Sequence, residues 1–219
     1  MLTRFFESRF FTFLGKAVDV ILLSLLWCLT SLPVFTIGAS TVALYYTIHK
    51  CVYQDRDYCF KTYFVAFKDN FKQATLTWFI MLAVGLIFAY DTWFCQKLKE
   101  QGDVIGNMTI LFLVFICLLV IWAVYTLLYM ARFSNGFKAT LKVGAGLAIL
   151  HFGTSLVVLI TTALFAACAY VLKGSLILIP GVYMVALHPA MEKIFRSVMS
   201  EEDGALEDAR NGVYTRKED

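Results

Sequence analysis

Five long stretches of this 219-residue chain contain no Asp, Glu, Lys or Arg, and together they cover 124 residues. They are residues 20–49, 73–90, 104–131, 143–172 and 174–191. The hydrocarbon core of a bilayer is about 30 Å thick, so a helix that rises about 1.5 Å per residue crosses it in roughly 20 apolar residues. The stretches therefore predict an all-α, polytopic transmembrane helical bundle with five hydrophobic segments.

The composition excludes several other classes of protein. Only 16% of the residues are charged, whereas about 25% is usual in a soluble domain. Residues 110–129 are apolar on every side, which is typical of a helix in lipid and not of an alternating barrel strand. The net charge of +3 is spread over short connections, so we expect no nucleic acid partner. The six cysteines form no CxxC pair and predict no disulfide framework.

The first stretch is too long for one simple crossing, because 30 residues in a helix would measure about 45 Å. Pro33 and Gly38 interrupt it, and Thr36 can cap a helix that follows. One interpretation is a single span that ends near Thr36 with an amphipathic extension. The other is a helical hairpin over residues 17–49, which is re-entrant if its arms of about 15 residues are too short to cross.

The distribution of positive charge favours the hairpin. With a hairpin, 16 of the 19 Lys and Arg fall on one side of the membrane; with five simple crossings, the larger share is only 13. Cytoplasmic loops collect Lys and Arg. We therefore expect both termini in the cytoplasm, with the first hydrophobic stretch retained as an uncleaved anchor.

Two amphipathic segments flank this hairpin. Residues 2–14 combine phenylalanines with Arg4 and Arg9 and predict a helix at the membrane interface. Residues 58–72 predict an amphipathic helix more strongly, because four phenylalanines recur at spacings of 4, 3 and 4 and three lysines form a second stripe. These residues are Phe60, Phe64, Phe67 and Phe71, with Lys61, Lys68 and Lys72. We expect a helix on the cytoplasmic leaflet, or alternatively a docking surface for a partner protein.

The remaining segments complete a single transmembrane domain over residues 1–191. The expected spans are residues 73–93, 107–131, 146–172 and 174–191, the last of them interrupted by Pro180 and Pro189. Residues 192–219 are rich in charge and predict an exposed cytoplasmic tail.

Few residues in the spans suggest chemistry. No GxSxG, HExxH or Walker-type motif is present, so we predict no enzyme and no cofactor. His151 and Thr154, together with Pro180, could line a polar cavity between the last two segments, although a hydrogen bond between helices explains His151 more simply. His188 is expected to be an interfacial cap. His49, Cys51 and Cys59 lack a fourth ligand and a CxxC or HxxxH spacing, and we predict no metal site.

Two motifs resemble the YesL-like family of bacterial membrane proteins: LWCLTSLPVFTIGA at residues 26–39, followed by ALYY at 43–46, and YFVAFKDNFKQA at residues 63–74. The family has no established biochemical activity. The resemblance implies an inner membrane protein, often encoded near ATP-driven carbohydrate importers. It suggests a non-enzymatic accessory or regulatory role in carbohydrate uptake, with a transporter permease or a second copy of the chain as partner. The alternative is a small-solute transporter or channel.

Overall fold

The computed structural model describes residues 2–54, 58–172, 178–201 and 204, with side chains from residue 13 onward. All regular structure in these ranges is helical, which confirms the predicted all-α class. The elements are α1 (Leu2–Thr30), the 3₁₀ turn η1 (Val34–Thr36), α2 (Ile37–Thr47), the π-helical turn η2 (Ile48–Tyr53), α3 (Cys59–Glu100), the 3₁₀ turn η3 (Val104–Met108), α4 (Thr109–Arg132), α5 (Phe137–Leu150), α6 (Phe152–Val171) and α7 (Ile179–Val198).

Four helical segments among the described residues are long and apolar enough to cross a membrane. They are Phe13–Thr30 of α1, the whole of α3, Val104–Arg132 across η3 and α4, and α6. These segments indicate a membrane protein. The expected fifth segment, residues 174–191, is not among them: α7 begins at Ile179, and residues 173–177 lie outside the described part of the chain.

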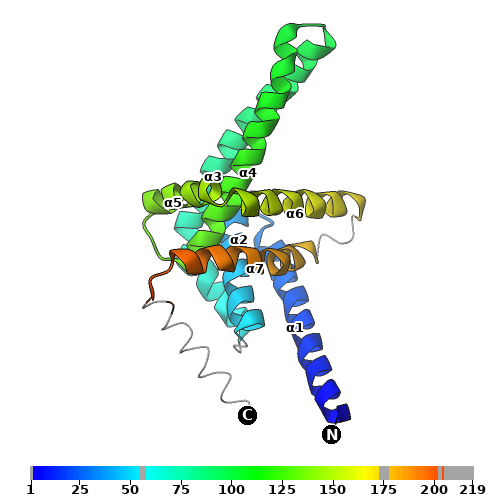
Figure 1. The fold of residues 1–219 in the computed structure, drawn as a ribbon, viewed down its shortest axis with the longest axis vertical. Coiled ribbons are helices and arrows are strands. Elements are labelled where there is room, and N and C mark those ends of the chain that lie inside the picture. Colours follow the sequence, from blue (N-terminus) through cyan, green and yellow to red (C-terminus); the bar gives the residue numbers. More distant parts are fainter. Residues whose placement is uncertain (1, 55–57, 173–177, 202–203, 205–219) are drawn as a thin grey trace.

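The helices cross one another instead of forming a simple parallel bundle. α3 and α4 make a long antiparallel pair whose tip projects away from the other helices (Figure 1). α5, α6 and α7 run across this pair, and α1 extends from the crossing region in the direction away from the tip (Figure 1). α2, α4 and α7 pack together where the helices cross.

The tip of the α3–α4 pair is closed by a helix-ending motif. Gly102 has a positive φ of 84°, its N–H donates to the carbonyl of Lys99 across 3.1 Å, and the N–H of Asp103 donates to the carbonyl of Leu98 across 3.1 Å. This is the Schellman arrangement, which favours glycine at the left-handed position. The Asp103 carboxylate then accepts a hydrogen bond from the N–H of Ile105 across 3.0 Å and starts η3.

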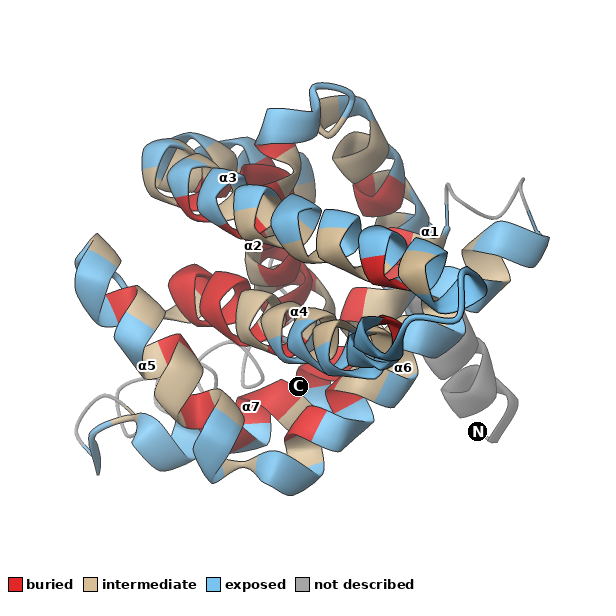
Figure 2. Ribbon diagram, turned by 90° about the horizontal axis from the view of Figure 1, so that it is seen from above, coloured by how far each residue is buried: buried red, intermediate tan, exposed pale blue. Residues whose placement is uncertain are grey.

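α2 lies at the centre of the core, and most of its residues are buried (Figure 2). Its approach to α3 is close because Gly38 has no side chain: a Cβ there would lie 2.6 Å from the carbonyl oxygen of Ala74 and 2.6 Å from Cβ of Trp78. The indole N–H of Trp78 donates to the carbonyl of Val34 across 2.9 Å. The turn between α1 and α2 is thus fastened to α3 near the start of the uncharged residues 73–90.

The chain reverses where Pro33 interrupts it, between the end of α1 at Thr30 and the start of α2 at Ile37. Thr36 is the N-cap residue of α2, but its hydroxyl makes no capping bond. It donates backward to the carbonyls of Thr30 and Pro33. Thr36 therefore holds the turn closed, in place of the capping role that the sequence predicts for it.

Three expected boundaries differ in the structure. Residues 2–14 and the first arm of the hairpin form one continuous helix, α1. Of the expected helix 58–72, residues 59–72 continue without a break into the span 73–93 as α3, and Tyr58 is the N-cap residue. A change from charged to apolar residues does not end a helix, and α3 contains no proline. Conversely, the expected span 146–172 is divided at His151, whose φ of −107° and ψ of 52° are not helical.

Candidate functional site: a buried cluster of ionisable side chains

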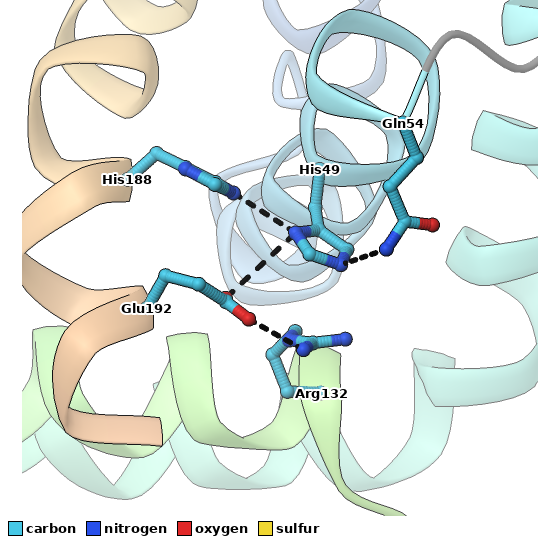
Figure 3. Close-up of polar contacts among 5 residues, drawn as sticks. All are labelled: His49, Gln54, Arg132, His188 and Glu192. Atoms are coloured by element: carbon cyan, nitrogen blue, oxygen red, sulfur yellow. Dashed lines mark hydrogen bonds and ion pairs between the residues drawn. The ribbon is translucent and has the colours of Figure 1, made fainter. Parts of the chain in front are cut away.

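Five polar side chains from three parts of the chain meet at the crossing of η2, α4 and α7 (Figure 3). They are His49, Gln54, Arg132, His188 and Glu192. His49 and His188 are 4% and 5% exposed, and Glu192 is 9% exposed. Ionisable groups are costly to bury and are retained when they are paired or used, so this cluster is the candidate functional site.

The polar atoms of the cluster form a continuous chain of contacts. His49 Nδ1 and His188 Nε2 are 2.9 Å apart, and His49 Nε2 lies 2.8 Å from the amide nitrogen of Gln54. His49 Nδ1 is also 3.7 Å from Glu192 Oε2. Arg132 donates to Glu192 Oε1 across 2.6 Å. The two oxygens of Glu192 therefore have different surroundings: Oε1 accepts from Arg132, and Oε2 faces the histidines.

Helical spacing explains why these side chains converge. His188 and Glu192 are four residues apart on α7, so they lie on the same face of that helix. Arg132 is the last residue of α4, where a cation also interacts favourably with the helix dipole. His49 belongs to η2, the π-helical turn that extends α2. A π-helical turn rotates side chains relative to a regular α-helix, and such turns are frequent at functional sites.

Pro189 affects the same site because it leaves one carbonyl of α7 without its usual helical hydrogen bond. A proline inside a helix has no N–H for the carbonyl four residues earlier, which here belongs to Val185 on α7. The Tyr53 hydroxyl donates to this carbonyl across 3.1 Å. The ring of Tyr53 stacks on that of His188 with centroids 3.7 Å apart and an angle of 10° between the planes. Tyr53 thus supplies the hydrogen bond that the Val185 carbonyl lacks, and its ring fixes the orientation of the His188 imidazole.

Electrostatics keep His188 in its neutral form. Burial and the positive charge of the neighbouring Arg132 lower the pKa of His188 to about 4. Both effects disfavour the imidazolium, because burial removes its hydration and Arg132 repels it. At neutral pH the Arg132 guanidinium and the Glu192 carboxylate therefore form an ion pair next to a neutral imidazole.

A polar cavity lies on the other side of Arg132. It has a volume of about 590 Å³ and is bounded by α3 and by the connection from α4 to α5. Asp69, Asn70 and Gln73 line it from α3, and Asn135 lines it from the connection. Gln73 donates to the carbonyl of Asn135 across 3.0 Å. The Phe-Lys-Asp-Asn-Phe-Lys-Gln motif therefore supplies polar groups to this cavity as well as residues to the core.

The four phenylalanines of residues 58–72 lie along one stripe of α3 and differ in how far they are buried. Phe67 and Phe71 pack against the core, and their rings contact each other with centroids 5.5 Å apart. Phe60 and Phe64 are about half exposed, at 49% and 50%. Three lysines of a neighbouring stripe are also exposed: Lys61, Lys68 and Lys72. We call these five exposed residues the outer α3 face. α2 packs on α3 and covers part of its surface, but it leaves these residues exposed.

The structure does not bring the three residues of the expected polar cavity together. Pro180 lines a cavity of about 280 Å³ whose walls are almost wholly apolar, between α1, α2, α6 and α7. His151 lies at the break between α5 and α6, and Thr154 lies in the first turn of α6. Neither of them lines that cavity.

The sequence interpretation missed most of the observed cluster. From the sequence, Arg132 is only a charge at the end of an apolar stretch, His188 is an interfacial cap and Glu192 is the first residue of the charged tail. The spacing of His188 and Glu192 was the available signal, since it places both on one helical face. Nothing in the sequence indicates that His49, 139 residues earlier, packs against them.

The structure thus defines a helical membrane protein with a buried cluster of ionisable side chains where its helices cross. Residues 20–92 match the model of a family described as "Protein of unknown function, DUF624". The matched segment runs from α1 to α3 and contains His49 and Gln54 but not Arg132, His188 or Glu192. No curated protein and no solved structure matches the chain.

Proposed function

We propose that this protein is a non-enzymatic accessory subunit of the bacterial cytoplasmic membrane that docks onto a transporter permease through its cytoplasmic side. The observation that carries the proposal is the outer α3 face. Two half-exposed aromatic rings, Phe60 and Phe64, and three exposed lysines belong to the same segment of α3, and apolar anchors together with charged groups are typical of sites where proteins bind one another.

The resemblance to the YesL-like family narrows the partner to an ATP-driven carbohydrate importer. In this proposal the lysines of the outer α3 face meet acidic residues of the permease, and Phe60 and Phe64 enter an apolar recess. The excess of Lys and Arg in residues 50–72 supports a cytoplasmic location for this face, and it also supports cytoplasmic termini.

The cavities support an accessory role over transport through the protein itself. A pathway between α6 and α7 would need polar groups along its length, whereas the cavity at Pro180 is apolar. The polar cavity beside Arg132 lies between α3 and the α4–α5 connection. Its position is compatible with binding a loop of a partner.

Co-purification from the native membrane tests this proposal. We expect the full-length protein to retain permease subunits, identified by mass spectrometry, and we expect the triple variant Lys61→Glu, Lys68→Glu, Lys72→Glu to lose them. Lys97→Glu with Lys99→Glu is the matched control, because these lysines lie at the far end of α3. Recovery of the protein alone or as a homo-oligomer, with unchanged growth on sugars after its deletion, would refute the proposal.

A further inference from the structure

The buried cluster contains a set of side chains that is typical of transition-metal sites. His49, His188 and Glu192 each direct one potential ligand atom toward the others, and these three atoms lie within 4.8 Å of one another. Two imidazole nitrogens and one carboxylate oxygen are common protein ligands for Zn²⁺. We propose that these three residues bind a divalent transition-metal ion, with Zn²⁺ as the best match to the ligand set.

The distances between the ligand atoms are suited to one shared ion. His49 Nδ1 lies 2.9 Å from His188 Nε2 and 3.7 Å from Glu192 Oε2. Bonds of about 2.0–2.2 Å from a tetrahedral zinc ion place neighbouring ligand atoms about 3.3 Å apart. The two measured distances lie on either side of this value, so a small rotation of the Glu192 carboxylate and a slight separation of the two rings accommodate the ion.

Each ligand is held by a second group, as metal ligands commonly are. The Gln54 amide contacts His49 Nε2, the ring of Tyr53 stacks on His188, and Arg132 binds the oxygen of Glu192 that faces away from the histidines. When the Gln54 side-chain amide flips, its oxygen takes the place of its nitrogen and accepts a hydrogen bond from the Nε2–H of His49. The lone pair of His49 Nδ1 then becomes available to a metal.

The site has three protein ligands and therefore an open position for a water molecule. The Tyr45 hydroxyl is buried and has no hydrogen-bond partner among the residues that the structure describes. The Tyr45 ring lies beside that of His188 with centroids 5.8 Å apart. A metal-bound water is a suitable partner for this hydroxyl. The imidazole ligands favour Zn²⁺, Co²⁺, Ni²⁺ or Cu²⁺ over Mg²⁺ and Ca²⁺, which prefer oxygen.

Arg132 carries a positive charge into the same site and opposes the binding of a dication. Its guanidinium is bound to Glu192 Oε1, so the carboxylate lies between the two positive charges and screens one from the other. The consequence is a weaker site than one with the same three ligands and no arginine. Because the ion joins η2 to α7, binding would couple the position of α2 to that of α7.

Cobalt binding to the full-length protein in lipid nanodiscs, purified without a histidine tag and treated with a chelator, tests the proposal. We expect one equivalent of Co²⁺ with visible absorption bands of a tetrahedral or five-coordinate ion, displaced by Zn²⁺. His49→Gln and His188→Gln should each weaken binding at least tenfold, since each removes a ligand. His151→Gln, at the α5–α6 break, is the matched control and should bind as the unmodified protein does.

The spectrum of the unmodified protein keeps the proposal testable if a ligand variant fails to fold. A sulfur-to-cobalt charge-transfer band would assign the metal to cysteines such as Cys51 and overturn the proposal. Absence of stoichiometric binding, or equal binding by the His49→Gln and His188→Gln variants, would also overturn it. These results are independent of co-purification with a permease, because the ligands lie in the core and not on the outer α3 face.

Discussion

Arg132, the last residue of α4, binds Glu192 of α7 with 2.6 Å between guanidinium nitrogen and carboxylate oxygen, and both side chains are almost fully buried. The pair links α4 to α7 through two residues that are 60 positions apart in the sequence. A buried ion pair is costly to form, but the removal of only one partner costs more, because the other charge stays buried without compensation. The stability of the helix crossing should therefore depend on both partners being present.

Removal of Arg132 alone is the first test of this dependence. We expect Arg132→Gln to lower the free energy of unfolding by about 3–5 kcal/mol, because Glu192 is left as a buried charge without its cation. Thermal unfolding in one detergent measures the change. Lys97→Gln is the control: its pair with Glu100 is more than half exposed, so it should cost less than about 1 kcal/mol.

A double replacement separates the charges from the packing. Arg132→Met combined with Glu192→Leu removes both charges and retains apolar volume, and we expect it to be more stable than Arg132→Gln alone. An equal loss in the single and double variants would show that the ion pair is not what stabilises this crossing.

The contact between α2 and α3 should be sensitive to one added methyl group. A Cβ at Gly38 lies 2.6 Å from two atoms of α3, and relief of this contact must move backbone. We expect Gly38→Ala to lower the free energy of unfolding by about 1–3 kcal/mol. Gly146→Ala in α5 has open space around its Cβ, and alanine is the better helix former, so this control should be neutral or stabilising by up to about 1 kcal/mol.

The tip of the α3–α4 pair depends on the positive φ of Gly102. Gly102→Ala forces a Cβ into the left-handed region, and we expect a local cost of about 1–2 kcal/mol. Faster hydrogen exchange at the amides of residues 98–105 would measure it. Gly102→Asn should exchange more slowly than Gly102→Ala, because asparagine tolerates this conformation. Gly136→Ala, at a φ of −62°, should leave the exchange rates unchanged.

Cysteine labelling in a cysteine-free background tests the orientation in the membrane. We expect Asp103→Cys at the tip to react with an impermeant reagent from outside the cell, and Ser134→Cys to react only after permeabilisation. Leu32→Cys should be protected from outside, because Trp78 fastens the neighbouring turn near the start of residues 73–90, as in a re-entrant hairpin. Labelling of position 134 from outside would contradict a cytoplasmic outer α3 face.

The fold class could be predicted from the sequence, whereas the helix boundaries could be predicted only in part. The reversal at Pro33 follows from local chemistry, since proline and glycine act on their own backbone. The sequence does not predict that residues 58–72 and 73–93 join in the single helix α3. The last charged residue marks an expected membrane boundary, but it does not mark the end of a helix. The sequence does not predict the helix break at His151, because no proline and no charged residue lies next to it.

The sequence by itself determined that this chain is helical and apolar enough for a membrane, because length, hydropathy and the absence of charge are properties of continuous segments. Tertiary structure alone decided which polar residues meet. His49 lies in one segment, Arg132 in a second and His188 with Glu192 in a third, and their proximity depends on how α2, α4 and α7 cross. A spacing in sequence places residues on one helical face, but only the packing of separate helices places those faces against one another.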